Sequence, residues 1–124
     1  MLYTIDKKKI EYMPHRKNYD LWRSLLSDQQ YIEIMIEMEN TLNSILNSNK
    51  QVFVSSFIPG SDWKFPYYYI YEACDEDIKN AGFFFGLLMW EAVQKHPETW
   101  AFMPYEDPNP AKDIKGKTYF KITL

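Results

Sequence analysis

Apolar and polar positions along this chain recur with helical and strand periods, and the most apolar stretch lies between Asp75 and His96. Every residue from Ala81 to Trp90 is apolar or glycine. Such a stretch predicts a helix that is covered on most sides. It is too short to cross a membrane, which takes roughly 20 consecutive apolar residues. We therefore expect a buried core helix over residues 76–96, around which the rest of the chain folds.

Both ends of this predicted helix carry boundary signals. Asp75 is a favourable N-cap, and two more acidic residues follow it in the first turn. Lys95 and His96 stand in the last turn, where cations are favourable, and Pro97 ends the helix. Gly82 and Gly86 lie on one helical face, so we expect a neighbouring backbone to approach closely there.

A second long helix is predicted over residues 28–47. Ser27 and Gln30 have the spacing of a capping box, in which each side chain bonds the backbone amide of the other residue. Apolar residues then recur at intervals of four and three, widened at the front by three isoleucines: Tyr31, Met35, Met38, Leu42 and Ile45, with Ile32, Ile34 and Ile36. Two interpretations of this seam remain open. It packs on the core helix within one subunit, or part of it forms a homodimer interface.

Shorter elements come from the remaining patterns. Residues 51–58 are apolar on both faces and predict a central strand, and residues 99–105 and 118–124 predict the two arms of a hairpin. In the second arm, Phe120, Ile122 and Leu124 alternate with polar positions and predict the buried face. A short helix is expected after Asn18, with Leu21, Trp22, Leu25 and Leu26 on its apolar face.

These elements predict an α+β fold. We expect a single compact domain, residues 1–124, in which a small antiparallel sheet of three or four strands packs against two main helices. The fourth strand would come from the N-terminal β-prone runs at residues 2–5 and 10–13, which predict a hairpin or one edge strand.

The loop after Pro59-Gly60 is the candidate binding site. Asp62 can fix this loop through bonds to nearby backbone amides. Trp63, with Tyr67 and Tyr68, would then offer a flat face for stacking or a hydrophobic anchor for a partner. In the competing interpretation, Trp63 folds back as a core plug together with Phe65.

Composition and charge narrow the function classes. Aromatic residues make up 18% of the chain, which predicts an aromatic core or an aromatic surface for a partner. The net charge is -3, and the acidic middle of the chain and the two arginines disfavour nucleic-acid binding. Both ends are basic, so six lysines could form one anion-binding patch or guard sheet edges: Lys7, Lys8, Lys9, Lys115, Lys117 and Lys121. Residues with AT-rich codons are frequent, which favours a bacterial or phage origin.

No signature of catalysis or of a cofactor site is present in the sequence. Known nucleophile, phosphate-loop, dinucleotide and zinc motifs are missing. We interpret Cys74 as a small core residue, and Cys74, His15 and His96 lack the spacing of zinc ligands. A single cysteine and the lack of a signal peptide or membrane span predict a cytosolic protein.

Two hypotheses of function follow. In the first, the chain is a regulatory or interaction protein without catalytic activity, such as an inhibitor, an antitoxin or a phage effector. It would bind a partner protein through an acidic, aromatic-rich surface. In the second, it is a small-molecule binder or minor enzyme with a pocket beside residues 59–71.

Overall fold

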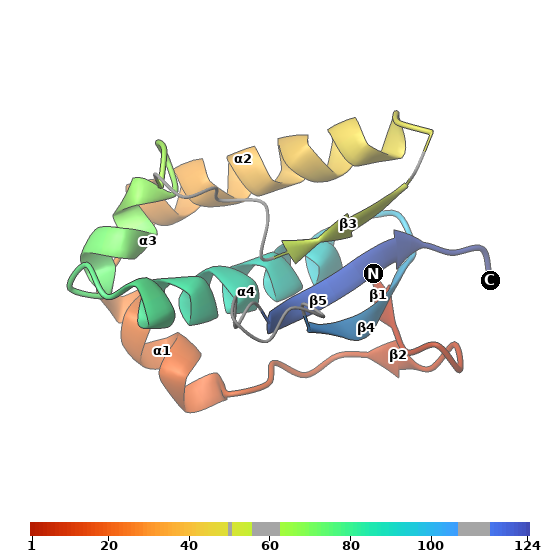
Figure 1. The fold of residues 1–124 in the computed structure, drawn as a ribbon, viewed down its shortest axis with the longest axis horizontal. Coiled ribbons are helices and arrows are strands. Elements are labelled where there is room, and N and C mark those ends of the chain that lie inside the picture. The colour runs from red at the N-terminus through yellow and green to blue at the C-terminus, as the bar shows by residue number, and fades with distance from the viewer. Residues whose placement is uncertain (50, 56–62, 107–114) are drawn as a thin grey trace.

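The computed structural model describes residues 1–49, 51–55, 63–106 and 115–124, and it shows a mixed α+β fold (Figure 1). Its elements in chain order are β1 (Leu2–Tyr3), β2 (Lys9–Ile10), α1 (Arg16–Ser24), α2 (Asp28–Leu46), β3 (Val52–Val54), α3 (Tyr68–Ala73), α4 (Ile78–Lys95), β4 (Trp100–Glu106) and β5 (Lys115–Lys121). The predicted fold class is confirmed. The finer description is wrong in detail: the described residues form five strands in one mixed sheet and four helices, where three or four antiparallel strands and two main helices were predicted.

The strand order in this sheet is β2-β1-β4-β5-β3. The strand β1 pairs parallel to β4, with Leu2 opposite Trp100, and every other described pair is antiparallel. The parallel pair arises because β2, β3 and the helices α1, α2, α3 and α4 separate β1 from β4 in the sequence, so the chain can return in either direction. The predicted central strand at residues 51–58 is instead β3 at the edge, and residues 56–58 lie outside the described part.

The predicted hairpin of β4 and β5 is present, but the face that it buries is not the predicted one. Tyr119 lies opposite Phe102 and Phe53 and is fully buried. Its ring stacks on that of Phe53 with 5.2 Å between centroids. Phe120 points to the other face, and Leu124 is 63% exposed. The inward face of β5 is thus the one predicted to be polar.

The core helix α4 begins two residues later than predicted. Its N-cap is Asp77, whose side chain accepts a hydrogen bond from the Asn80 amide at 3.0 Å. Asp75 and Glu76 precede it with left-handed φ angles of 53° and 59°. The helix ends before Pro97 as predicted. The close backbone approach expected at the helix glycines is wrong, because a Cβ at either of them would meet nothing within 4 Å.

The helix α2 begins as predicted. Ser27 Oγ accepts from the Gln30 amide at 3.1 Å, and Gln30 Oε1 accepts from the Ser27 amide at 2.9 Å. The buried residues of its seam are Ile34, Met38 and Leu42. The other two front isoleucines lie outside the core.

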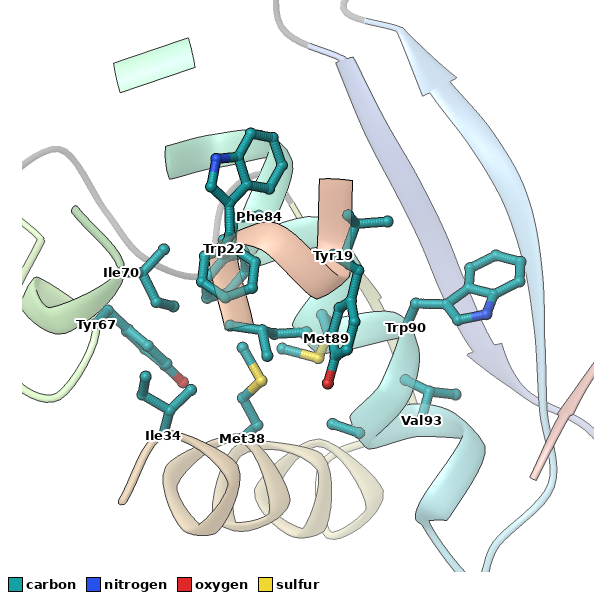
Figure 2. Packing of buried hydrophobic residues seen from close by; sticks show 14 of the residues in the cluster. Tyr19, Trp22, Ile34, Met38, Tyr67, Ile70, Phe84, Met89, Trp90 and Val93 are labelled. Atoms are coloured by element: carbon teal, nitrogen blue, oxygen red, sulfur yellow. The ribbon is translucent and has the colours of Figure 1, made fainter. Parts of the chain in front are cut away.

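The core is built around α4, which contacts α1, α2 and α3. In Figure 2, Met38 and Ile34 of α2 lie beside Met89 of α4 and Tyr67, while Tyr19 and Trp22 reach the same region from α1. The sheet joins this core through Trp90, whose ring meets that of Phe102 edge to face at 4.9 Å. In the described part of the chain, no helix has the length and hydropathy of a membrane span.

Candidate functional site

The segment from Trp63 to Ala73 holds most of the predicted binding residues, but it buries two of them. Trp63 is 9% exposed and stacks on Tyr71, with ring centroids 5.9 Å apart. Tyr67 is 7% exposed and meets Phe85 of α4 edge to face at 5.1 Å. Burial raises the pKa of Tyr67 to about 12. Trp63 and Tyr67 therefore anchor the segment to the core and do not present the predicted flat face.

The exposed rings of this segment belong to neighbouring residues. Phe65 is 68% exposed and Tyr68 is 46% exposed, while Tyr69 is half-buried. Phe65 and Tyr69 contact each other edge to face at 5.5 Å. Tyr68 was a predicted binding residue, whereas the sequence analysis missed Phe65 and Tyr69 as surface residues. Asp62 lies outside the described residues.

Carboxylates border these exposed rings. Hydrogen bonding to Glu72, one turn further along, raises the pKa of Tyr68. Hydrogen bonding to Glu33 of α2 raises the pKa of Tyr69. We call Phe65, Tyr68, Tyr69, Glu33 and Glu72 the aromatic–acidic surface. It combines apolar ring faces with negative charge, which suits contact with a cationic and partly apolar partner.

A groove of about 230 Å³ lies between α2 and the C-terminal end of α4. Its α2 side contains Ile32 and Ile36, which are 48% and 54% exposed, with Met35 between them. Its other side is formed by Ala92, Lys95, His96 and Pro97. Glu39 and Lys95 add one charge of each sign to its lining. We call this feature the isoleucine groove.

A group of polar contacts around Glu91 joins three helices beside this groove. The hydroxyls of Tyr19 in α1 and Tyr31 in α2 both donate to the Glu91 carboxylate in α4. Lys95 donates to Glu91 at 3.2 Å, and Arg23 lies 4.0 Å above the Tyr31 ring. Burial and the bond to Glu91 raise the pKa of Tyr19. This Glu91 cluster ties α1, α2 and α4 together.

His96 has a structural role that differs from the predicted cation. Its Nε2 donates to Asn43 Oδ1 at 2.9 Å, and its Nδ1 accepts from the Glu98 amide and from Trp100 Nε1 at 3.2 and 3.3 Å. A nitrogen that accepts two bonds carries no proton, so the ring is neutral. Burial, with the Met1 ammonium as a second cause, lowers the pKa of His96, while Glu39 and Glu98 oppose the shift.

The positive charge at the end of α4 comes from the Met1 ammonium and from Lys95. The Met1 ammonium donates to the carbonyls of Val93 and Glu98 at 3.0 and 2.8 Å and to that of His96. A cation at this end interacts favourably with the helix dipole. Lys95 in the last turn adds to this effect.

Three of the six lysines of the predicted basic patch have partners among the described residues: Lys9, Lys117 and Lys121. Lys9 forms an ion pair with Glu11, and Lys121 forms one with Glu98, both at 3.5 Å. Lys117 lies over the Trp90 ring, with Nζ 5.5 Å from the ring centroid. The ammonium groups of these three lysines thus interact with other residues of the protein. An anion-binding role for the lysines stays a prediction.

Among residues 1–49, 51–55, 63–106 and 115–124, no three His, Cys, Asp or Glu side chains gather as a metal site. Cys74 is buried, and burial raises the pKa of its thiol to about 11. The thiol is therefore protonated near neutral pH and is a poor nucleophile. Comparisons with protein-family models, curated proteins and solved structures found no match for this chain.

Proposed function

We propose that this chain is a small interaction or regulatory protein, of the inhibitor, antitoxin or phage-effector kind, that binds a partner protein through the aromatic–acidic surface. The observation that carries the proposal is the contrast between Trp63, which is 9% exposed, and Phe65, which is 68% exposed. A buried anchor thus holds an exposed phenylalanine two residues away. Large exposed apolar rings with polar neighbours are typical of contact surfaces.

Covering the exposed rings of this surface would contribute part of the free energy of binding. An aromatic side chain buries roughly 150–250 Å² when it is covered completely. Covering the exposed part of Phe65 would therefore contribute about 2–4 kcal/mol at roughly 25 cal/mol per Å². Tyr68 and Tyr69 add further area, and their hydroxyls remain bonded to Glu72 and Glu33. These carboxylates favour a partner segment that carries lysine or arginine next to apolar residues.

The alternative hypothesis of a small-molecule pocket beside residues 59–71 has less support. The described groove lies between α2 and α4. Its volume of about 230 Å³ is below the roughly 300–1,000 Å³ that is typical of small-molecule sites. Part of the 59–71 segment lies outside the described residues, so a pocket there stays a prediction.

The test is a comparison of surface variants in affinity capture from an extract of the organism that encodes the chain. The variant Phe65→Ala with Tyr68→Ala removes both exposed rings. Ile5→Ala is the matched control, because Ile5 is 60% exposed in the turn between β1 and β2. Proteins captured by the wild type and the control, but not by the double variant, are then purified and titrated against each chain by calorimetry.

We expect the purified partner to bind the double variant at least tenfold more weakly than the control. We also expect its affinity to fall as salt rises, because the carboxylates attract a cationic segment. Equal affinity for the double variant and the wild type would contradict the proposed surface.

A further inference from the structure

The isoleucine groove is a second exposed apolar feature, and it lies on another side of α2. Glu33 and Glu37 of α2 lie on the side of Tyr69 and Tyr67, whose pKa values they raise, burial being the larger cause for Tyr67. Ile32 and Ile36 instead border the groove toward α4. Two isoleucines one turn apart, each about half exposed, form an apolar ridge next to an apolar hollow.

The charges of the groove are arranged so that they complement a second copy of the same groove. Lys95 Nζ lies 3.1 Å from the Tyr31 hydroxyl, so the positive charge is at the level of Tyr31. Glu39 follows Tyr31 by two turns, about 12 Å further along α2. A twofold axis perpendicular to α2 at Met35 places position 31 of one copy beside position 39 of the other. It therefore sets Glu39 of each copy opposite Lys95 of the other.

The same rotation also matches the apolar parts. Ile36 is one residue from the level of the axis, so the Ile36 side chains of two antiparallel helices meet near it. Each Ile32 then reaches the hollow between Ile36 and Pro97 of the other copy. An interface between two copies related by a twofold axis requires such self-complementarity.

We propose that the isoleucine groove is the interface between two copies of this chain, in which the two α2 helices pack antiparallel across a twofold axis near Met35. A stable interface covers about 800 Å² per partner. That area is roughly a tenth of the 7660 Å² surface of the chain. The groove and the outer face of a helix of 19 residues can supply part of this area.

Sedimentation velocity over a concentration series tests the dimer. The wild type is expected to shift from the 14.9 kDa of one chain toward twice that mass as concentration rises. Ile36→Lys is expected to raise the Kd at least tenfold, and its exposed position lets the chain fold. Ile78→Lys is the matched control, because Ile78 is 70% exposed at the opposite end of α4, and it should dimerise like the wild type.

Charge exchange tests the predicted register. Glu39→Lys should weaken the dimer, and adding Lys95→Glu to it should restore part of the affinity, since the two charges are then exchanged in both copies.

A disulfide test leaves Lys95 and its contact with Glu91 unchanged. In a Cys74→Ala background, Ile36→Cys should give a covalent dimer on oxidation, and Ile78→Cys should not.

Two outcomes overturn the proposal. If the wild-type chain has the mass of one copy at every concentration, the groove is not a dimer interface. A dimer that forms equally well with Ile36→Lys uses a different surface.

Discussion

Replacing Glu91 by alanine tests whether its polar contacts hold the three helices together. The Glu91 side chain is only 12% exposed, and it accepts from the hydroxyls of Tyr19 and Tyr31. Hydrogen bonds to a charged group contribute about 1.5–3 kcal/mol each, and an unpaired buried hydroxyl costs about 1–3 kcal/mol. The ion pair with Lys95 adds less than about 1 kcal/mol, because the Lys95 side chain is 64% exposed.

Since these terms overlap, we expect Glu91→Ala to lower the free energy of unfolding by about 3–5 kcal/mol. This loss is large against the roughly 5–15 kcal/mol that stabilise a typical domain. Glu91→Gln keeps one acceptor oxygen at the same place, so its cost should be smaller. Urea denaturation followed by circular dichroism measures both, with the slope m checked for constancy.

A double-mutant cycle separates the bond to Tyr19 from general packing. Tyr19→Phe removes one donor and keeps the ring, so it should show a coupling energy of about 1.5–3 kcal/mol with Glu91→Ala. Glu11→Ala is the control, because that carboxylate is 77% exposed and its loss should change stability by less than about 0.5 kcal/mol. A loss below about 1 kcal/mol for Glu91→Ala, or a coupling near zero, would refute the proposed role of Glu91.

Three further predictions concern single residues. Ser27→Ala should cost about 1 kcal/mol in urea denaturation through loss of the capping box, and an unchanged midpoint would contradict the observed start of α2. Burial holds the pKa of His96 below its ordinary value of 6.5, so below that pH the unfolded chain binds a proton that the folded chain does not. The free energy of unfolding should therefore fall as pH drops below about 6.5 and rise toward neutral pH. This dependence of stability on pH should be weaker in His96→Asn and preserved in His15→Asn. Asparagine suits position 15 because it tolerates the left-handed backbone there. Trp63→Ala should cost about 3–5 kcal/mol in urea denaturation, whereas Phe65→Ala should cost less than about 1, and similar losses for the two would contradict their opposite burial.

Local signals in the sequence determined where the main helices lie. The capping box at Ser27 depends only on residues three apart, so it acts in the same way in any fold that contains the helix. The apolar stretch in α4 has too few polar positions to face water on most sides, and α4 is accordingly the helix that α1, α2 and α3 contact. Pro97 ended α4 for a reason that is also local, since proline restricts the residue before it.

The face of each strand was decided only by the tertiary structure. Tyr119 and Phe120 are both apolar enough to be buried, and a shift of one residue in register exchanges them. Tyr119 is buried because its ring stacks on Phe53 and lies opposite Phe102, contacts that depend on strands distant in sequence. The parallel pairing of β1 with β4 is a long-range contact of the same kind.

The candidate binding surface also depended on tertiary packing. The sequence indicated an aromatic segment after Gly60, but no local pattern separates a buried Trp63 from an exposed Phe65. The difference arises because Trp63 packs in the core on Tyr71 and Phe85, whereas the ring of Phe65 contacts Tyr69 at the surface. Composition and local pattern thus determined that an aromatic segment exists here, and the packing of α3 against α4 decided which of its rings remain exposed.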